Sequence, residues 1–285
     1  MTGFLFAALT GLFFGLQGSY SRYISKKLSF FALTCATILS AIPVLMIFLY
    51  STGIPQIDVA PFLLATLTSF TFNLFAIPLF FRALSVSPLY LTMPFTAFTP
   101  LFLVPIAWLT LGEWPDKSGF AGIFLILAGV YFIYLRDQDW LSPFRGLMKE
   151  SGSRYMLIVA VLWSVSGTVE KNAVLASSAA FYGLTVHILL AICFTGYLFI
   201  RQPQELASIK RFPKQLLIMS LISGLMVICQ LTALTMLPVS YVLSFKRSGI
   251  LVSIALGYWF LNEPDPRRNL TGAFMVVIGA ILLML

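Results

Sequence analysis

Long apolar runs alternate along the chain with short breaks that contain charged residues, proline or glycine. A membrane hydrocarbon core about 30 Å thick is crossed by a helix of roughly 20 apolar residues, which is close to the length of these runs. We therefore predict an all-α integral membrane protein with ten transmembrane helices. The predicted helices span residues 3–21, 30–50, 61–83, 88–111, 118–135, 154–173, 178–200, 214–236, 238–261 and 269–285.

The composition agrees with a membrane environment. Of the 285 residues, 59% are hydrophobic and 10% are charged, whereas soluble domains carry about 25% charged residues. A chain so poor in charge argues against a soluble enzyme, a nucleic-acid-binding protein and a disordered chain. The first apolar run has no Lys or Arg before it, and Gly18-Ser19-Tyr20 after it is a poor cleavage site. We expect a transmembrane helix there rather than a signal peptide.

The longest polar interval divides the chain nearly in half. It runs from Arg136 to Arg154, and five predicted helices lie on each side of it. We expect a first five-helix repeat at 1–137, a cytoplasmic linker at 138–153 and a second five-helix repeat at 154–285.

The two halves also match in sequence. A shift of 150 residues superposes Glu113 on Glu263, together with proline, phenylalanine, leucine and glycine positions, without a gap. Near the start of each half, segment 14–18 matches segment 163–167 at a shift of 149. Because each unit has an odd number of helices, the second copy enters the membrane from the opposite side, as in the inverted repeats of secondary transporters.

This duplicated pattern resembles the drug/metabolite transporter superfamily, ten-helix EamA-type branch. The resemblance rests on Ala-Leu at the end of helix 3, a proline before helix 4, Gly112-Glu113 at the end of helix 4, and glycines seven residues apart in helix 5. Each feature recurs in the second half, where Asn262-Glu263 replaces the Gly-Glu pair. The resemblance implies that helices 1, 3, 4, 6, 8 and 9 surround a central cavity.

The distribution of positive charge predicts an orientation. The chain carries 18 Lys and Arg against 10 Asp and Glu, a formal net charge of +8. Fourteen of the cations fall in the loops after helices 1, 3, 5, 7 and 9, and only Lys117 and Lys171 lie at the opposite face. Cytoplasmic loops hold the excess of Lys and Arg, so we predict a multi-pass protein of the inner or plasma membrane with both termini outside the cytoplasm. Many members of the resembled family have cytoplasmic termini, and the direction of transport stays open.

Two further cations, Lys246 and Arg247, lie within the ninth predicted helix. Arg247 follows Pro238 by nine residues, about 13 Å along a helix and close to the bilayer midplane. A charge at that depth costs about 2.5–3.5 kcal/mol, so the pair requires water, a partner or a ligand. Arg and Lys both suit carboxylate or phosphate groups, which favours an anionic substrate. A buried ion pair with Glu170, bonds to helix-4 carbonyls and a position nearer the interface are the alternatives.

The Lys-Arg dipeptide also resembles the pair that binds substrate phosphate in the triose-phosphate and nucleotide-sugar branch of the same superfamily. Glu170 is a candidate for proton coupling, and the alternative is that Glu170 and Lys171 cap a helix end. Uncharged polar side chains on the helices expected to surround the cavity are candidates for substrate contact or for helix packing. They are Gln17, Asn73, Thr92, Thr96, Gln230, Tyr241 and Ser244. His187 has no second metal ligand nearby, which favours a packed histidine over a proton relay.

Helices 4 and 9 differ in proline content. Helix 4 contains Pro94, Pro100 and Pro105, whereas helix 9 has no internal proline. Since proline removes a helix hydrogen bond, we expect helix 4 to be a bendable gate and helix 9 a stiff arm. Glu113 and Glu263 stand at helix ends, where capping or an interface role is expected. The glycines of helices 5 and 10 predict close helix approach, within the chain or in a homodimer.

Motifs of common enzymes are missing from the sequence. It contains no HExxH, GxSxG, GxxxxGK[ST] or GxGxxG, and one histidine without a cysteine cluster cannot form a zinc site. We therefore expect no enzyme activity, no cofactor, no metal and no nucleic-acid partner, but a small-molecule substrate and membrane lipid as partners. The sequence predicts a transporter of a small organic anion that works by alternating access. The alternative is a proton-coupled carrier of amino acids or amphipathic metabolites or drugs. An intramembrane enzyme or a non-transporting receptor is a different class.

Overall fold

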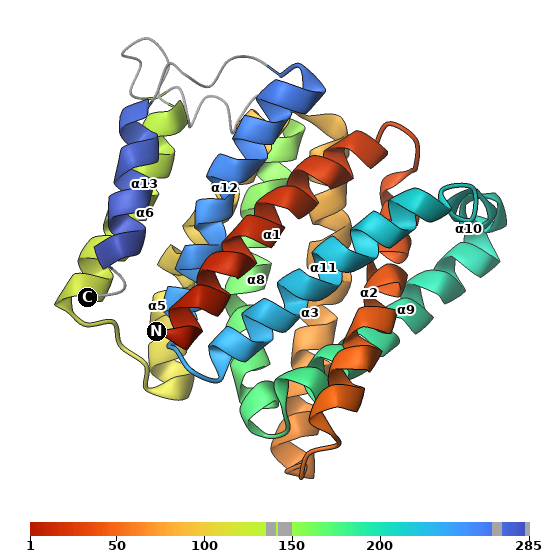
Figure 1. Cartoon of the computed structure of the whole chain (residues 1–285), viewed down its shortest axis with the longest axis horizontal. Coiled ribbons are helices and arrows are strands. Elements are labelled where there is room, and N and C mark those ends of the chain that lie inside the picture. The colour runs from red at the N-terminus through yellow and green to blue at the C-terminus, as the bar shows by residue number, and fades with distance from the viewer. Residues whose placement is uncertain (135–140, 142–149, 264–269, 283–285) are drawn as a thin grey trace.

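The computed structural model describes residues 1–134, 141, 150–263 and 270–282, and all regular structure within them is helical. The helices form a bundle in which segments from both halves of the chain are interleaved (Figure 1). The first half contains α1 (Thr2–Ile24), α2 (Phe30–Thr52), α3 (Val59–Val86), α4 (Leu89–Thr92), the 3₁₀ helix η1 (Met93–Phe98), α5 (Thr99–Leu111) and α6 (Lys117–Tyr134). The second half contains α8 (Ser151–Leu175), α9 (Ala179–Arg201), α10 (Pro203–Ile209), α11 (Pro213–Leu234), α12 (Val239–Leu261) and α13 (Leu270–Leu282).

Each predicted transmembrane helix has a helical segment at its place in the chain, with ends that differ by a few residues. Among the described residues, eight segments are long and apolar enough to cross a membrane. The apolar part of α6, Lys117–Gly129, is shorter, and α13 borders residues outside the described part. Eight of the ten crossings predicted from sequence therefore coincide with candidate membrane spans. The short helix α10 lies in a polar interval, where an apolar pattern gives no signal.

Several sequence-based expectations fall outside the described residues. The linker predicted at 138–153 is described only at Leu141 and at residues 150–153. Five of the cations that the charge count assigns to cytoplasmic loops also lie outside the described residues. They are Arg136, Arg145, Lys149, Arg267 and Arg268.

The fourth predicted helix is interrupted at its prolines. It is divided into α4, η1 and α5, with Pro94 and Pro100 in the first turns of η1 and α5 and Pro105 inside α5. Because each proline lacks an N–H donor, the α-helical bonding pattern is broken and a tighter 3₁₀ segment replaces it. The counterpart α12 is continuous and contains no proline. The sequence predicted one helix with missing hydrogen bonds at these prolines, and the structure divides it into three segments. Its role as a bendable gate stays a prediction.

Helix pairs from different halves build the bundle. α1 packs against α11 and α12, and α8, its counterpart in the second half, packs against α3 and α5. α2 packs against α9 and α11. Exchanging the two halves converts the α1–α11 pair into the α8–α3 pair, so the packing agrees with a two-repeat architecture.

α6 and α13 lie side by side at one edge of the bundle (Figure 1). A methyl group added at Gly129 would come within 2.6 Å of the Gly272 carbonyl oxygen, and one at Gly279 within 2.7 Å of the Gly122 carbonyl oxygen. The two helices are therefore antiparallel and cross at repeat-related glycines, as expected for inverted repeats. These glycines contact each other within one chain, so they supply no free surface for the homodimer considered from sequence.

The bundle has two ends, which differ in the turns that they carry. The N-terminal end carries Met1 and the α8–α9 and α11–α12 turns, and the Thr2 hydroxyl lies 3.9 Å from the Met236 sulfur there. The opposite end carries the α1–α2 and α3–α4 turns, where Arg22 bonds the Leu84 carbonyl oxygen at 2.6 Å, and α10 (Figure 1).

The crossing of α1 and α12 is close because glycines meet there. A methyl group on Gly11 would come within 2.6 Å of the Phe245 carbonyl oxygen, one on Gly15 would overlap the Gly249 carbonyl oxygen, and one on Gly249 would overlap the Gly11 carbonyl oxygen. Phe14 lies on this stretch of α1 and is fully buried. The contact between backbones therefore brings the middle of α12 directly against Phe14.

This crossing should not tolerate a side chain. We expect Gly249→Ala to lower the free energy of unfolding by about 1–3 kcal/mol, because overpacking forces the two backbones apart. Gly196→Ala in α9 is the matched control, since no atom lies within 4 Å of the added methyl group and alanine favours a helix. Thermal unfolding of the purified protein in detergent measures both effects. Equal melting temperatures for the two variants would contradict the close crossing.

Candidate functional site

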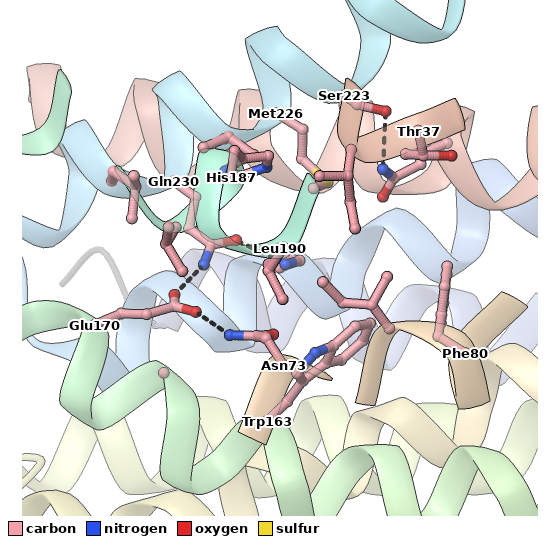
Figure 2. Close-up of a pocket in the computed structure, with 18 of the residues that line it drawn as sticks. Thr37, Asn73, Phe80, Trp163, Glu170, His187, Leu190, Ser223, Met226 and Gln230 are labelled. Atoms are coloured by element: carbon pink, nitrogen blue, oxygen red, sulfur yellow. Dashed lines mark hydrogen bonds between the residues drawn. The ribbon is translucent and has the colours of Figure 1, made fainter. Parts of the chain in front are cut away.

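A cavity of about 120 Å³ lies between α1, α2, α3, α8, α9, α11 and α12 (Figure 2). Its wall is mainly aliphatic and aromatic, with a limited set of polar groups. The polar and charged lining residues are Gln17, Thr37, Asn73, Trp163, Glu170, Tyr182, His187, Ser223, Gln230, Lys246 and Arg247. The second and seventh predicted helices, which are α2 and α9, contribute to this wall, whereas no described side chain of the fourth predicted helix does. In this the cavity differs from the helix set that the family resemblance implies.

Lys246 and Arg247 both reach this cavity from the middle of α12. Arg247 is fully buried and Lys246 is 7% exposed. The Lys246 Nζ donates a hydrogen bond to the Gln230 Oε1 at 2.6 Å. The Arg247 Nε and Nη1 have no hydrogen-bond partner among the described residues. Buried polar groups are normally paired, so Arg247 presents unused donors at the edge of a cavity.

Two aromatic rings lie against both cations. The Arg247 guanidinium carbon is 5.2 Å from the Phe14 ring centroid and 5.4 Å from that of Trp163. The Lys246 Nζ is 5.1 Å and 5.2 Å from the same two centroids. Ring faces attract cations electrostatically, so Phe14 and Trp163 offset part of the cost of burying the pair without occupying the hydrogen-bond donors of Arg247.

Glu170 lies within the cavity at the centre of a hydrogen-bond network (Figure 2). The Gln230 Nε2 donates to the Glu170 Oε2 at 2.9 Å, and the Ser166 hydroxyl and the Asn73 amide donate to the Glu170 Oε1 at 3.0 Å and 3.3 Å. Gln230 therefore joins the Glu170 carboxylate to the Lys246 ammonium through its two amide atoms. The described residues show no direct ion pair of Glu170 with Lys246 or Arg247, and Lys171 pairs with Glu113 instead of sharing a helix cap with Glu170.

Part of this network is repeated in the other half. The Gln17 Nε2 donates to the Ser223 Oγ at 3.0 Å, and the Asn73 Nδ2 donates to the Ser166 Oγ at 2.6 Å. Gln17 and Ser166 are related by the shift of 149 residues, and Asn73 and Ser223 by the shift of 150. The same shift pairs Gln230 with Phe80. The uncharged bonds are thus symmetric, whereas the charged groups belong to the second half alone.

Four residues that the sequence offered as candidates for substrate contact lie outside the cavity wall. The Thr92 and Thr96 hydroxyls donate to the carbonyl oxygens of Pro88 and Met93 at 3.0 Å and 2.6 Å. Threonine in an interrupted helix bonds its own backbone in this way, which takes both side chains away from a ligand. Ser244 is fully buried and its hydroxyl has no partner among the described residues.

Tyr241, the fourth of them, lies at the N-terminal end of the bundle. Its hydroxyl donates to the Asp116 Oδ1 at 3.0 Å. Asp116 also accepts from the Gly119 N–H at 2.6 Å and from the Ser118 hydroxyl at 2.9 Å. These bonds, with that of Gly119 first, hold the pKa of Asp116 below its usual value. Tyr241 therefore acts at the start of α6 instead of at the cavity.

Some cavity residues were not predicted. Trp163 and Tyr182 are aromatic, and sequence does not distinguish a cavity ring from a lipid-facing one. Ser223, which lines the cavity, and Ser166, which donates to Glu170, are the repeat partners of Asn73 and Gln17, so the internal repeat could have identified them. His187 lines the cavity, with its Nδ1 2.8 Å from the Gly183 carbonyl oxygen.

The bridge through Gln230 should be important for stability. We expect Gln230→Leu to lower the free energy of unfolding by about 3 kcal/mol, because each bond to a buried charged group contributes about 1.5–3 kcal/mol. Gln17→Leu is the control. It removes the uncharged bond to Ser223 and should cost about 1 kcal/mol. Chemical or thermal unfolding gives both values, and an equal or reversed order would contradict a charge-linking role for Gln230.

Comparisons with known proteins agree with this architecture. A family model described as the EamA-like transporter family matches residues 1–135 and 151–285. One solved structure, described only as the crystal structure of a protein, aligns over 97% of this chain and 95% of its own chain with a TM-score of 0.63. The two sequences are 16% identical, so the likeness concerns the fold alone. No curated protein matches the chain.

Proposed function

Because this chain belongs to the EamA-like transporter family of the drug/metabolite transporter superfamily, we propose that it carries a small organic anion across a membrane by alternating access. Family membership and the apolar helices make it a multi-pass membrane protein, and members of the family transport small molecules. The anion would carry a carboxylate or phosphate group that binds at Arg247.

The unpaired hydrogen-bond donors of the buried Arg247 guanidinium are the observation that carries this proposal. Apart from His187, the cavity wall holds two cationic side chains and one carboxylate, that of Glu170. The carboxylate is occupied by three uncharged donors, which leaves the Arg247 Nε and Nη1 available. A planar guanidinium with free donors binds carboxylate or phosphate through parallel hydrogen bonds. An anion at this position would also offset the cost of a buried, uncompensated charge.

The volume of the cavity and the residues of its wall limit the size and the polarity of the rest of the substrate. A volume of about 120 Å³ suits a small solute. Ile77, Val186 and Leu231 give the wall an apolar surface, while polar groups gather near Glu170 and Gln230. These features favour a compact molecule with one anionic group, an apolar body and a few hydrogen-bonding groups.

The charge of the loops supports an orientation for the carrier. Lys26, Lys27, Lys210, Arg211 and Lys214 are exposed and belong to the turns at the end opposite the N-terminus. Since cytoplasmic loops are rich in Lys and Arg, we propose that this end faces the cytoplasm and that the N-terminal end faces outward.

A proton-coupled carrier of amino acids or amphipathic metabolites is the second candidate, and the position of Glu170 favours it. Its carboxylate lies in the same cavity as Arg247 and is connected to Lys246 through Gln230. A buried carboxylate that gains and loses a proton can drive transport, and such groups inside membranes mark proton pathways.

Substitution of Arg247 tests the anion proposal. We expect Arg247→Gln to lower the uptake of small carboxylates or phosphates into proteoliposomes at least about tenfold, because the charged, forked group is lost. Arg82→Gln is the matched control. Arg82 also lies over two aromatic rings, at 5.3 Å from that of Phe30 and 5.1 Å from that of Tyr155, but it is not a cavity residue. Undiminished anion uptake by Arg247→Gln would contradict the proposal.

Glu170→Gln separates the two candidates. If Glu170 couples transport to protons, this variant loses uptake driven by a pH gradient but retains exchange of labelled for unlabelled substrate. If the carrier exchanges anions without protons, both activities remain within about twofold of the unsubstituted protein, since the amide has the shape of the carboxylate and its one oxygen can still accept from Gln230. Transport assays with and without an imposed pH gradient give the answer.

A further inference from the structure

Two charged clusters stand at the two ends of the bundle, away from the cavity. The first latch, at the N-terminal end, consists of Glu113 and Lys171. Glu113 pairs with the Lys171 ammonium and accepts a hydrogen bond from the Val239 N–H at 2.8 Å. The Lys171 Nζ also donates to the Leu237 carbonyl oxygen at 2.8 Å. The latch therefore joins the ends of α5 and α8 to the start of α12.

The second latch, at the opposite end, consists of Glu263 and Arg22. The two Glu263 carboxylate oxygens accept from the Leu89 N–H at 3.1 Å and 3.0 Å, and the Arg22 Nε lies 3.7 Å from the Glu263 Oε1. The Arg22 Nη1 donates to the carbonyl oxygens of Leu84 and Ser85 at 2.6 Å and 3.0 Å. This latch joins the ends of α12 and α1 to the start of α4.

The two latches are built from repeat-related positions. Glu263 follows Glu113 by 150 residues, and Lys171 follows Arg22 by 149. Each glutamate comes directly after a left-handed residue, Gly112 with φ of 67° or Asn262 with φ of 55°, which ends the helix and turns the chain back.

The helices that the latches hold begin with proline. Pro88 precedes α4 and Pro238 precedes α12, and a proline side chain cannot accept from the first N–H groups of a helix. The glutamates of the other half supply that cap instead, and the positive end of the helix dipole attracts them. The start of each of these helices thus depends on a carboxylate that reaches across the boundary between the two halves.

The cavity lies between the latches. Lys246 is seven residues, about 10 Å, from the start of α12, and Leu261 at the end of α12 lies about 22 Å beyond Lys246. Since each latch connects one half of the chain to the other, the halves cannot separate at one end while the latch there is intact. The latch side chains are 10% to 20% exposed, so they lie at the edge of the bundle, where water reaches the broken bonds as that end opens.

We propose that the first latch closes the cavity toward the N-terminal face, that the second latch closes it toward the opposite face, and that the carrier breaks them one at a time. This inference rests on the alternating access of the proposed function. It assigns Glu113, Lys171, Glu263 and Arg22 as the residues that control which face is open.

Accessibility of a cavity cysteine tests the inference without any substrate. The reporter is Ser223→Cys in a chain whose native cysteines, Cys35, Cys193 and Cys229, are replaced by alanine. A membrane-impermeant maleimide is applied from each face of vesicles, and an epitope tag at the N-terminus identifies the faces. Glu113→Gln should raise labelling from the N-terminal face about threefold or more and lower it from the opposite face, and Glu263→Gln should do the reverse.

The controls separate gating from general damage. Glu205→Gln removes a carboxylate of α10 that belongs to neither latch and should leave both labelling rates unchanged. Lys171→Gln and Arg22→Gln keep the helix-capping carboxylates and replace a glutamate variant that fails to fold. Lys171→Gln should raise labelling from the N-terminal face, and Arg22→Gln should raise it from the opposite face, which is the mirror pattern of the two latches. Unchanged labelling, or equal changes at both faces, would overturn the inference. Labelling does not depend on the cargo, so a wrong substrate assignment would appear in the Arg247→Gln transport assay and leave the mirror pattern intact.

Discussion

Two adjacent cations on one turn of α12, deep between apolar helices, impose the constraint that the surrounding structure satisfies. Burying a charge without compensation costs several kcal/mol, and Lys246 and Arg247 are buried together. Gln230 connects Lys246 to the carboxylate of Glu170. Two aromatic rings lie against both cations, and the glycine crossing of α1 with α12 brings one of these rings, Phe14, into position. Compensation of Arg247 remains incomplete, and a cavity begins there.

The molecule combines a symmetric frame with an asymmetric centre. Hydrogen bonds of uncharged residues, the glycine crossing of α6 with α13 and the glutamate clusters at the two ends all recur in both halves. A frame of this kind has two equivalent ways to open. The charged groups of the cavity occur once, because Ser21, Thr96 and Ala97 occupy the positions that match Glu170, Lys246 and Arg247. Under the proposed function, one half would supply most of the recognition chemistry while both halves would supply the movement.

Helix positions could be predicted from sequence, since a bilayer fixes the length of an apolar crossing, and the internal repeat identified Glu113 and Glu263 as equivalent. The cavity wall was predicted less well. Helices that are apolar all round carry little periodic signal for their inward face, so Thr96 and Ser244 were candidates although they do not line the cavity. Trp163 lines it, but a single aromatic residue in an apolar helix has the same sequence signature whether it meets a cation or a lipid.

The most direct test of the central claim is binding of small solutes to the purified protein, followed by thermal unfolding. A ligand that binds the folded state raises the melting temperature. Compounds of matched size and shape should be compared as carboxylates or phosphates and as their neutral amides or esters. The anions should raise the melting temperature in a concentration-dependent way, and the neutral analogues should not. Equal or greater stabilisation by the neutral compounds would contradict an anion site at Arg247.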